Sequence, residues 1–177
     1  MPRLFVAIRP PAFVRERLLS IMDGISAARW QSEDQFHLTL RFIGEADRRV
    51  ANDVHTALQG VRHPPFEIAL HGLGTFERRG TPAALWAGVT QHQPLRELHK
   101  KVDQACQRAG LPPERRAYLP HVTLARLNRA SGPVAPVIEG MGGFTTAPFA
   151  VDVFHLYESI LSSGGSHYVI IETYRLK

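Results

Sequence analysis

The chain has 177 residues, a length that suits one domain, residues 1–177, with a substantial core. Its hydrophobic fraction of 44% and charged fraction of 21% are typical of a globular protein and not of a disordered chain. No stretch approaches the ~20 apolar residues that a membrane span requires. The formal net charge of +5 favours anionic partners, although genome composition can produce the same bias. The apolar run at residues 4–8 is too short for a secretory signal, and Cys106 is the only cysteine, so we expect a cytoplasmic protein without a disulfide.

The hydrophobic pattern alternates between short strands and amphipathic helices. Strands are predicted at residues 4–8, 37–44, 66–76, 84–89, 149–156 and 168–176 and around residue 121, and helices at residues 14–25, 50–61 and 94–109. A strand, a helix opened by proline and a second strand follow one another twice along the chain. This repetition predicts two related lobes in an α+β fold with antiparallel or mixed sheets.

One tetrapeptide pattern, His-x-Thr-Leu, occurs twice. The first motif is His37-Leu38-Thr39-Leu40, and the second, 84 residues later, is His121-Val122-Thr123-Leu124. Residue frequencies give about 0.05 expected matches, so chance does not account for the pair. In a strand, residues i and i+2 share a face, so each motif presents a histidine beside a threonine. Two such strands facing one cleft supply a base and an acid, the equipment for opening a phosphodiester.

The residues next to the motif histidines admit two interpretations. Thr39 and Thr123 can donate to phosphate oxygens, but threonine also favours strands for conformational reasons alone. Arg41 shares the strand parity of His37, whereas Arg126 lies on the opposite face unless its strand twists or bulges. Either arginine can bind phosphate or lie in solvent. A structural role is expected for the other seven histidines.

These motifs and their flanks resemble the 2H phosphoesterases, and within them the bacterial and archaeal RNA 2′,3′-cyclic phosphodiesterases, historically called 2′-5′ RNA ligases. The resemblance covers most of the chain. The stretches that carry it are Arg3-Leu4-Phe5-Val6-Ala7-Ile8, residues 37–44, Leu85-Trp86-Ala87-Gly88-Val89, residues 119–126 and Leu156-Tyr157-Glu158-Ser159-Ile160-Leu161.

The resemblance implies a bilobal 2H phosphoesterase fold with pseudo-twofold symmetry, in which the motif strands face each other across a central cleft. It implies hydrolysis of RNA 2′,3′-cyclic phosphate ends to 2′-phosphomonoesters, with His37 as proton donor and His121 as proton acceptor. By motif position Arg126 is the phosphate-binding arginine, and Thr39 and Thr123 would hold phosphoryl oxygens beside it. The implied partners are RNA ends, including tRNA fragments, or small cyclic nucleotides, and we expect a monomer.

The sequence has no carboxylate cluster and no Cys/His spacing typical of a catalytic metal, so we expect neither a metal nor another cofactor. Phe5 and Phe42 are candidates to stack a terminal base, although a place in the core is the commoner role for such residues. Two alternative functions stay open: ATP-independent 2′-5′ RNA ligation at the same site, and nucleotide binding without turnover.

Overall fold

The structure is a computed structural model and describes residues 1–90 and 92–177. Its helices are α1 (Ala12–Leu19), the 3-10 helix η1 (Glu33–Gln35), α2 (Arg48–Gln59), α3 (His92–Arg108) and α4 (Ala135–Gly140). Its strands are β1 (Arg3–Ile8), β2 (Arg29–Trp30), β3 (Leu38–Glu45), β4 (Phe66–Ile68), β5 (Leu70–Arg78), β6 (Thr81–Val89), β7 (His121–Arg126), β8 (Phe149–Val151), β9 (Val153–Ser162) and β10 (Gly165–Arg175).

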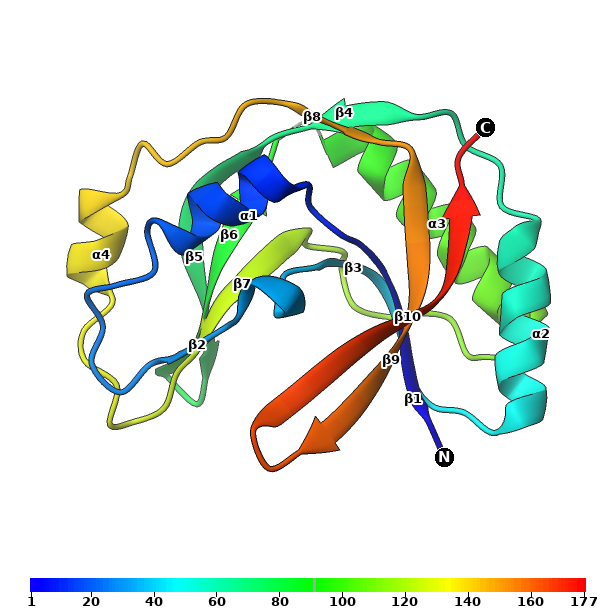
Figure 1. The fold of residues 1–177 in the computed structure, drawn as a ribbon, viewed down its shortest axis with the longest axis horizontal. Helices are drawn as coiled ribbons and strands as arrows, with labels where there is room; N and C mark the ends of the chain where they lie inside the picture. Colours follow the sequence, from blue (N-terminus) through cyan, green and yellow to red (C-terminus); the bar gives the residue numbers. More distant parts are fainter. Residues whose placement is uncertain (91) are drawn as a thin grey trace.

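The strands form an eight-stranded sheet and a separate two-stranded sheet. The large sheet has the order β10-β9-β1-β3-β7-β6-β5, and β2 pairs with β7 beside this path. Every pairing is antiparallel. Figure 1 shows two lobes, with β5, β6 and β7 on the left and β1, β9 and β10 on the right. The predicted α+β class with antiparallel sheets is confirmed.

Apart from β10, the strands of the large sheet are arranged symmetrically about the central pair β3–β7. β1 lies between β3 and β9, and β6 lies between β7 and β5, so β1–α1–β3 and β6–α3–β7 occupy equivalent places in the two lobes. The short strands β4 and β8 pair with each other. They precede β5 and β9, which are equivalent strands of the two lobes, so β4 and β8 are equivalent as well. The two related lobes predicted from the repeated order of elements are therefore present.

Helices α2 and α3 pack side by side, and α3 also packs on β3 (Figure 1). The apolar stripe predicted for α3 is fully buried, because residues three or four apart share one helix face. Its members are Leu95, Leu98, Val102 and Ala105. Asp47 caps α2 by accepting a hydrogen bond of 2.8 Å from the Val50 backbone nitrogen. Helix α3 thereby supports the central strand β3, and α2 packs on the outside of α3 and against β10.

Helix α1 is shorter than its apolar spacing predicts. It ends at Leu19, whereas the pattern extends to Ile25. Ile21 and Ile25 are still buried, but they belong to an irregular segment in which Gly24 has a φ of 90°. Here the spacing of three and four residues indicates which side chains are buried, but it does not indicate a helical backbone. No helix in the described part of the chain is long and apolar enough to cross a membrane.

Candidate active site

The two His-x-Thr motifs meet at the centre of the large sheet. β3 pairs with β7 through Leu38 and Val122, the middle residues of the motifs. Because the pairing is antiparallel, each motif histidine lies across from the threonine of the other motif. Leu38 and Val122 are buried in the core, so the polar residues share the opposite face. His37 and His121 therefore lie at diagonal corners of a rectangle, where such neighbours are about 7–8 Å apart.

Strand β3 has a bulge at the last residue of its motif. Thr39 pairs with Ala7 and Arg41 pairs with Val6, so Leu40 is an extra residue opposite β1. One extra residue moves the side chains that follow it to the other face of the strand. Arg41 therefore points into the core with Val6 and is only 5% exposed. The prediction that Arg41 shares the face of the motif histidine is wrong, because it assumed a regular strand.

Strand β7 has a bulge at the equivalent position. Its pairing with β6 shifts by one residue between Leu85 and Trp86, which makes Leu124 the extra residue. Arg126 is consequently moved onto the face of His121, where it borders a cavity. Arg126 can belong to the site only if β7 has a bulge, and the structure has this bulge. The same kind of irregularity thus removes one arginine from the site face and adds another.

The two lobes differ at the next position on this face. Arg126 follows His121 by five residues, and Phe42 follows His37 by five residues. Phe42 pairs with Phe5, and its side chain is 50% exposed. Because the motif strands run antiparallel, Arg126 lies beyond the His37 end of the rectangle and Phe42 beyond the His121 end. One end of the site is cationic and the other is aromatic.

The two histidine rings are anchored in the same way. Nδ1 of His37 lies 2.8 Å from the carbonyl oxygen of Gln35, and Nδ1 of His121 lies 2.7 Å from that of Leu119. A carbonyl oxygen only accepts, so Nδ1 donates in both pairs and carries the proton. No hydrogen bond from either Nε2 is found in the described chain. In the neutral ring each Nε2 therefore keeps a lone pair for a reacting proton.

Aromatic residues enclose His37. The ring centroids of Phe5 and Tyr168 lie 4.8 Å and 5.1 Å from that of His37. Phe5 also stacks on Tyr157 at 4.8 Å and is only 4% exposed. No free ring face is left for a nucleotide base, so Phe5 is not the base-stacking residue that it was a candidate to be, and it has the core role that is commoner for such residues. The ring of Phe5 instead packs against the ring of His37.

His121 is packed in a comparable way in the other lobe. The ring centroids of Phe76 and Trp86 lie 4.8 Å and 6.1 Å from that of His121. The indole ring of Trp86 passes so close to Gly74 that an added Cβ there would lie 2.4 Å from it. Gly74 is therefore necessary for the position of Trp86. Nothing in the sequence pattern pointed to these aromatic supports, which come from strands distant in the chain.

Burial lowers the pKa of both histidines. For His37 the pKa falls to about 4, mainly through burial, with nearby His121 and Arg126 adding to the effect and the hydrogen bond to Gln35 opposing it. The pKa of His121 is lowered for the same main reason, and the charge of Arg126 also lowers it. Both rings are therefore neutral in the free protein at neutral pH.

The family model of the 2′-5′ RNA ligase superfamily matches residues 27–160, a range that contains both motifs. The chain belongs to this superfamily. It is similar to an RNA 2′,3′-cyclic phosphodiesterase of Aeropyrum pernix, with 36% identity over 159 residues that cover 86% of this chain and 90% of that protein. An RNA 2′,3′-cyclic phosphodiesterase of Archaeoglobus fulgidus is 28% identical and covers 94% of this chain and 96% of its own length.

Solved structures show the same relationship. LigT of Escherichia coli, crystallised with 3′-AMP, matches the fold with a TM-score of 0.79 and 26% sequence identity, over 100% of this chain and 99% of that chain. The 2H phosphoesterase resemblance and the bilobal fold that it implies are confirmed.

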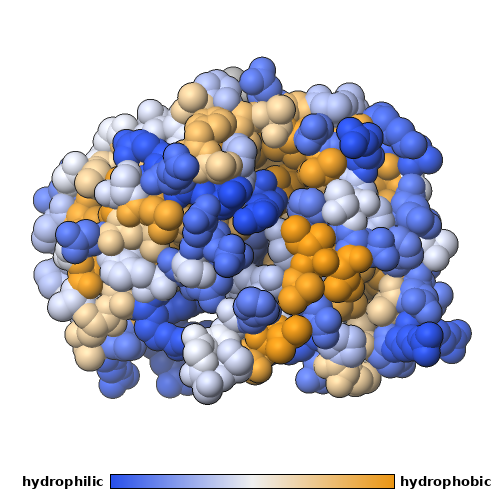
Figure 2. All heavy atoms as spheres, viewed as in Figure 1, coloured by the Kyte–Doolittle hydropathy of each residue, from blue (hydrophilic) through white to orange (hydrophobic). Residues whose placement is uncertain are grey.

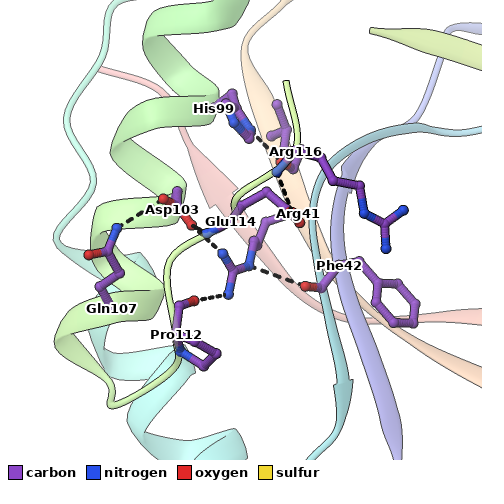
Figure 3. A network of polar contacts seen from close by, with 9 residues as sticks. Arg41, Phe42, His99, Asp103, Gln107, Pro112, Glu114 and Arg116 are labelled. Atoms are coloured by element: carbon purple, nitrogen blue, oxygen red, sulfur yellow. Dashed lines mark hydrogen bonds and ion pairs between the residues drawn. The ribbon is translucent and has the colours of Figure 1, made fainter. Parts of the chain in front are cut away.

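In this member of the 2′-5′ RNA ligase superfamily, side chains from outside the sheet bind the backbone at the β3 bulge. Nδ1 of His99, on α3, donates to the carbonyl oxygen of Leu40 at 2.7 Å (Figure 3). The hydroxyl of Tyr118 donates to the carbonyl oxygen of Thr39 at 2.9 Å. The rings of His99 and Tyr118 are stacked at 3.9 Å. This pair satisfies carbonyl groups at the bulge, where β3 departs from regular pairing.

Arg41 has a structural role behind the same bulge. Its guanidinium donates to the carboxylate of Asp103, to the carbonyl oxygen of Pro112 and, at 3.2 Å, to that of Phe42. Asp103 also accepts from the backbone nitrogen of Glu114 at 3.1 Å. Figure 3 shows the guanidinium enclosed between α3 and the segment that precedes β7. The buried charge is thus paired and hydrogen-bonded, as burial requires.

A cavity of about 610 Å³ adjoins the His37 end of the site. Its walls are β2 and the end of β7, the segment around η1, and the turn of the β9–β10 hairpin. Figure 2 shows the hollow between the tip of this hairpin and the lobe that carries β2. The volume is typical of small-ligand sites. Most of its lining is polar and includes Arg29, Gln31, Gln35, Arg126 and Ser166, with Tyr168 at the boundary to His37.

Proposed function

We propose that the protein hydrolyses terminal RNA 2′,3′-cyclic phosphodiesters to 2′-phosphomonoesters by general acid–base catalysis. The observation that carries the proposal is the pair of identically anchored histidines at diagonal corners of the central strand pair. The activity named for the similar proteins of Aeropyrum pernix and Archaeoglobus fulgidus supports the substrate class. Candidate substrates range from tRNA fragments to small cyclic nucleotides.

The proposed reaction is an in-line displacement at phosphorus. A water molecule attacks the phosphorus atom, and Nε2 of His121 accepts the proton that the water loses. The bond between phosphorus and O3′ breaks, and Nε2 of protonated His37 donates its proton to O3′. The products are a 3′-hydroxyl and a 2′-phosphate. Attack and departure occur on opposite sides of phosphorus, so acid and base must lie apart, as the diagonal arrangement allows.

Thr39, Thr123 and Arg126 are proposed to donate hydrogen bonds to the non-bridging phosphoryl oxygens. All three lie on the site face of the motif strands. Their donors stabilise the negative charge that increases on those oxygens in the transition state. The exposed ring of Phe42 at the other end of the site is still a candidate to contact a base.

The acid role of His37 is compatible with its lowered pKa. An anionic phosphate beside the ring favours the charged imidazolium and raises the pKa in the complex. Burial makes the protonated ring a strong acid, which helps it to release its proton to O3′. The bound substrate thus supplies the negative charge that stabilises the proton on His37.

We propose that no metal takes part. Among residues 1–90 and 92–177, no three His, Cys, Asp or Glu side chains are grouped so that they can hold a metal ion. The roles above are all assigned to side chains of the chain itself. Hydrolysis measured in excess EDTA should equal that without chelator, and restoration of a lost rate by a divalent cation would contradict this part of the proposal.

The decisive experiment is incubation of a short RNA that ends in a 2′,3′-cyclic phosphate. Hydrolysis to a product whose phosphate is shown by NMR to be on O2′ supports the proposal. A 3′-phosphate product, or tight mononucleotide binding without turnover, contradicts it. Adding an RNA with a free 5′-hydroxyl tests the reverse chemistry, because accumulation of a 2′-5′ linked product without ATP would show that ligation dominates.

A further inference from the structure

Two arginines lie side by side on the lining of the cavity beside His37. Arg29 on β2 is the direct partner of Arg126 on β7 in the antiparallel register, so both side chains lie on the same face. Like charges directly opposite each other destabilise a sheet. None of the salt bridges found in the described chain involves either of them. An anion bound between the two guanidinium groups would offset their repulsion.

The cavity wall opposite β2 is held in place. The side chain of Arg29 reaches the hairpin turn, since its Nη2 lies 3.6 Å from where a Cβ on Gly165 would be. Nε2 of Gln35 donates to the carbonyl oxygen of Ser166 at 2.8 Å, which joins the segment that carries His37 to the same hairpin. The hairpin turn and the segment that precedes His37 therefore form a fixed polar part of the cavity wall beside Arg29.

The proposed reaction indicates which part of an RNA enters this cavity. O3′ is the leaving atom and belongs to the terminal ribose, so that ribose lies on the His37 side of phosphorus and water lies on the His121 side. The rest of the RNA continues from the 5′ carbon of the same ribose. The cavity is at the His37 end, so it is on the side of the RNA chain.

We propose that Arg29 binds the phosphate that links the terminal nucleotide to the preceding one, with Arg126 between this phosphate and the reacting one. This inference rests on the proposed function and adds a substrate class to it: oligonucleotides are preferred to cyclic mononucleotides. A guanidinium fork matches two phosphate oxygens, and such bonds are among the stronger hydrogen bonds in proteins. The polar lining suits ribose and phosphate better than a base.

The test compares three substrates: a cyclic mononucleotide, a dinucleotide that ends in a cyclic phosphate, and the same dinucleotide with an uncharged methylphosphonate linkage. The wild type is measured beside Arg29→Gln and beside Arg175→Gln, which removes the same charge from an exposed position at the far end of β10. Arg29→Lys serves as a conservative variant that keeps the charge but loses the fork.

For the wild type, kcat/KM should be about 10-fold higher for the charged dinucleotide than for the methylphosphonate, and the difference should shrink with added salt. Arg29→Gln should reduce this preference to about 2-fold or less, Arg29→Lys should keep part of it, and Arg175→Gln should leave it unchanged. A preference that persists in Arg29→Gln overturns the inference. An equal loss on all three substrates also overturns it, because Arg29 would then act on the reacting phosphate.

Failure of the proposed function has a different signature. Binding can be measured without turnover on the corresponding products, the charged dinucleotide and the methylphosphonate dinucleotide that each end in a 2′-phosphate. Calorimetry gives the dissociation constants of both. A wild type that hydrolyses none of the substrates, yet binds the charged dinucleotide about 10-fold more tightly through Arg29, overturns the hydrolysis and supports the cavity assignment. Equal affinities for the two dinucleotides overturn the cavity assignment, whatever the activity.

Discussion

Leu38 and Val122 are direct partners in the central sheet, and each is the middle residue of a His-x-Thr motif. This single register position relates the two motifs by a local twofold arrangement, because an antiparallel pair looks the same from both of its strands. Both residues are buried, and their neighbours on either side form the site face. The relative placement of the two motif histidines therefore depends on one pair of residues in the core.

Removal of either motif histidine should reduce hydrolysis of a cyclic-phosphate RNA by about 10²–10⁴-fold, since each ring is assigned one proton transfer. His37→Ala and His121→Ala are the variants. His167→Ala, at an exposed position on β10, is the matched control and should keep the parental rate. Thermal unfolding of all three variants shows whether the fold is kept. Parental rates in both motif variants would refute the assignment.

The pH dependence should reflect the lowered pKa of both histidines. The active form holds one proton on the pair, so kcat/KM falls as the pH rises above the higher free-protein pKa and falls again below the lower one, about 4 for His37. The maximum of kcat/KM should therefore lie below pH 6.5. Bound phosphate raises both pKa values, so the maximum of kcat should lie at higher pH. A kcat/KM that increases from pH 6 to pH 8 would disprove this account.

The ion pair behind the β3 bulge should contribute strongly to stability. Arg41→Ala leaves the Asp103 carboxylate without its buried partner, and we expect the free energy of unfolding to drop by about 3 kcal/mol. Urea denaturation measures the change. Arg9→Ala is the control, because Arg9 pairs with Asp34 at 3.8 Å on the surface and its loss should cost less than about 1 kcal/mol. Equal losses in the two variants would show that the buried pair has no special role.

Gly74→Ala should disturb the aromatic support of His121. The added methyl group would lie 2.4 Å from the Trp86 ring, so the ring or the strand must move, at a cost of about 1–3 kcal/mol. A displaced catalytic ring can lower the rate by up to about 10²-fold. Gly140→Ala places the same methyl group where nothing lies within 4 Å and should leave activity unchanged. Unaltered stability and rate in Gly74→Ala would show that Trp86 does not constrain His121.

Local sequence rules predicted the elements correctly where the backbone is regular. The 3.6-residue period identified α3, and the alternation along each motif placed a histidine and a threonine on one face. The same rules failed at Arg41 and needed an exception for Arg126. Both arginines come just after a bulge. A bulge depends on the hydrogen bonds that the neighbouring strand offers, and the alternation of residues along one strand carries no information about these bonds.

The sequence by itself determined the α+β class, the repeated order of elements and the rarity of the two motifs, because these depend on residue types and on spacing along one segment. Tertiary structure decided that Leu38 pairs with Val122, that Arg41 turns inward while Arg126 turns to the site, and that Arg29 faces Arg126. Each of these relationships joins residues far apart in the chain. Register between distant strands is set by packing and hydrogen bonding of the whole sheet, so no single segment encodes it.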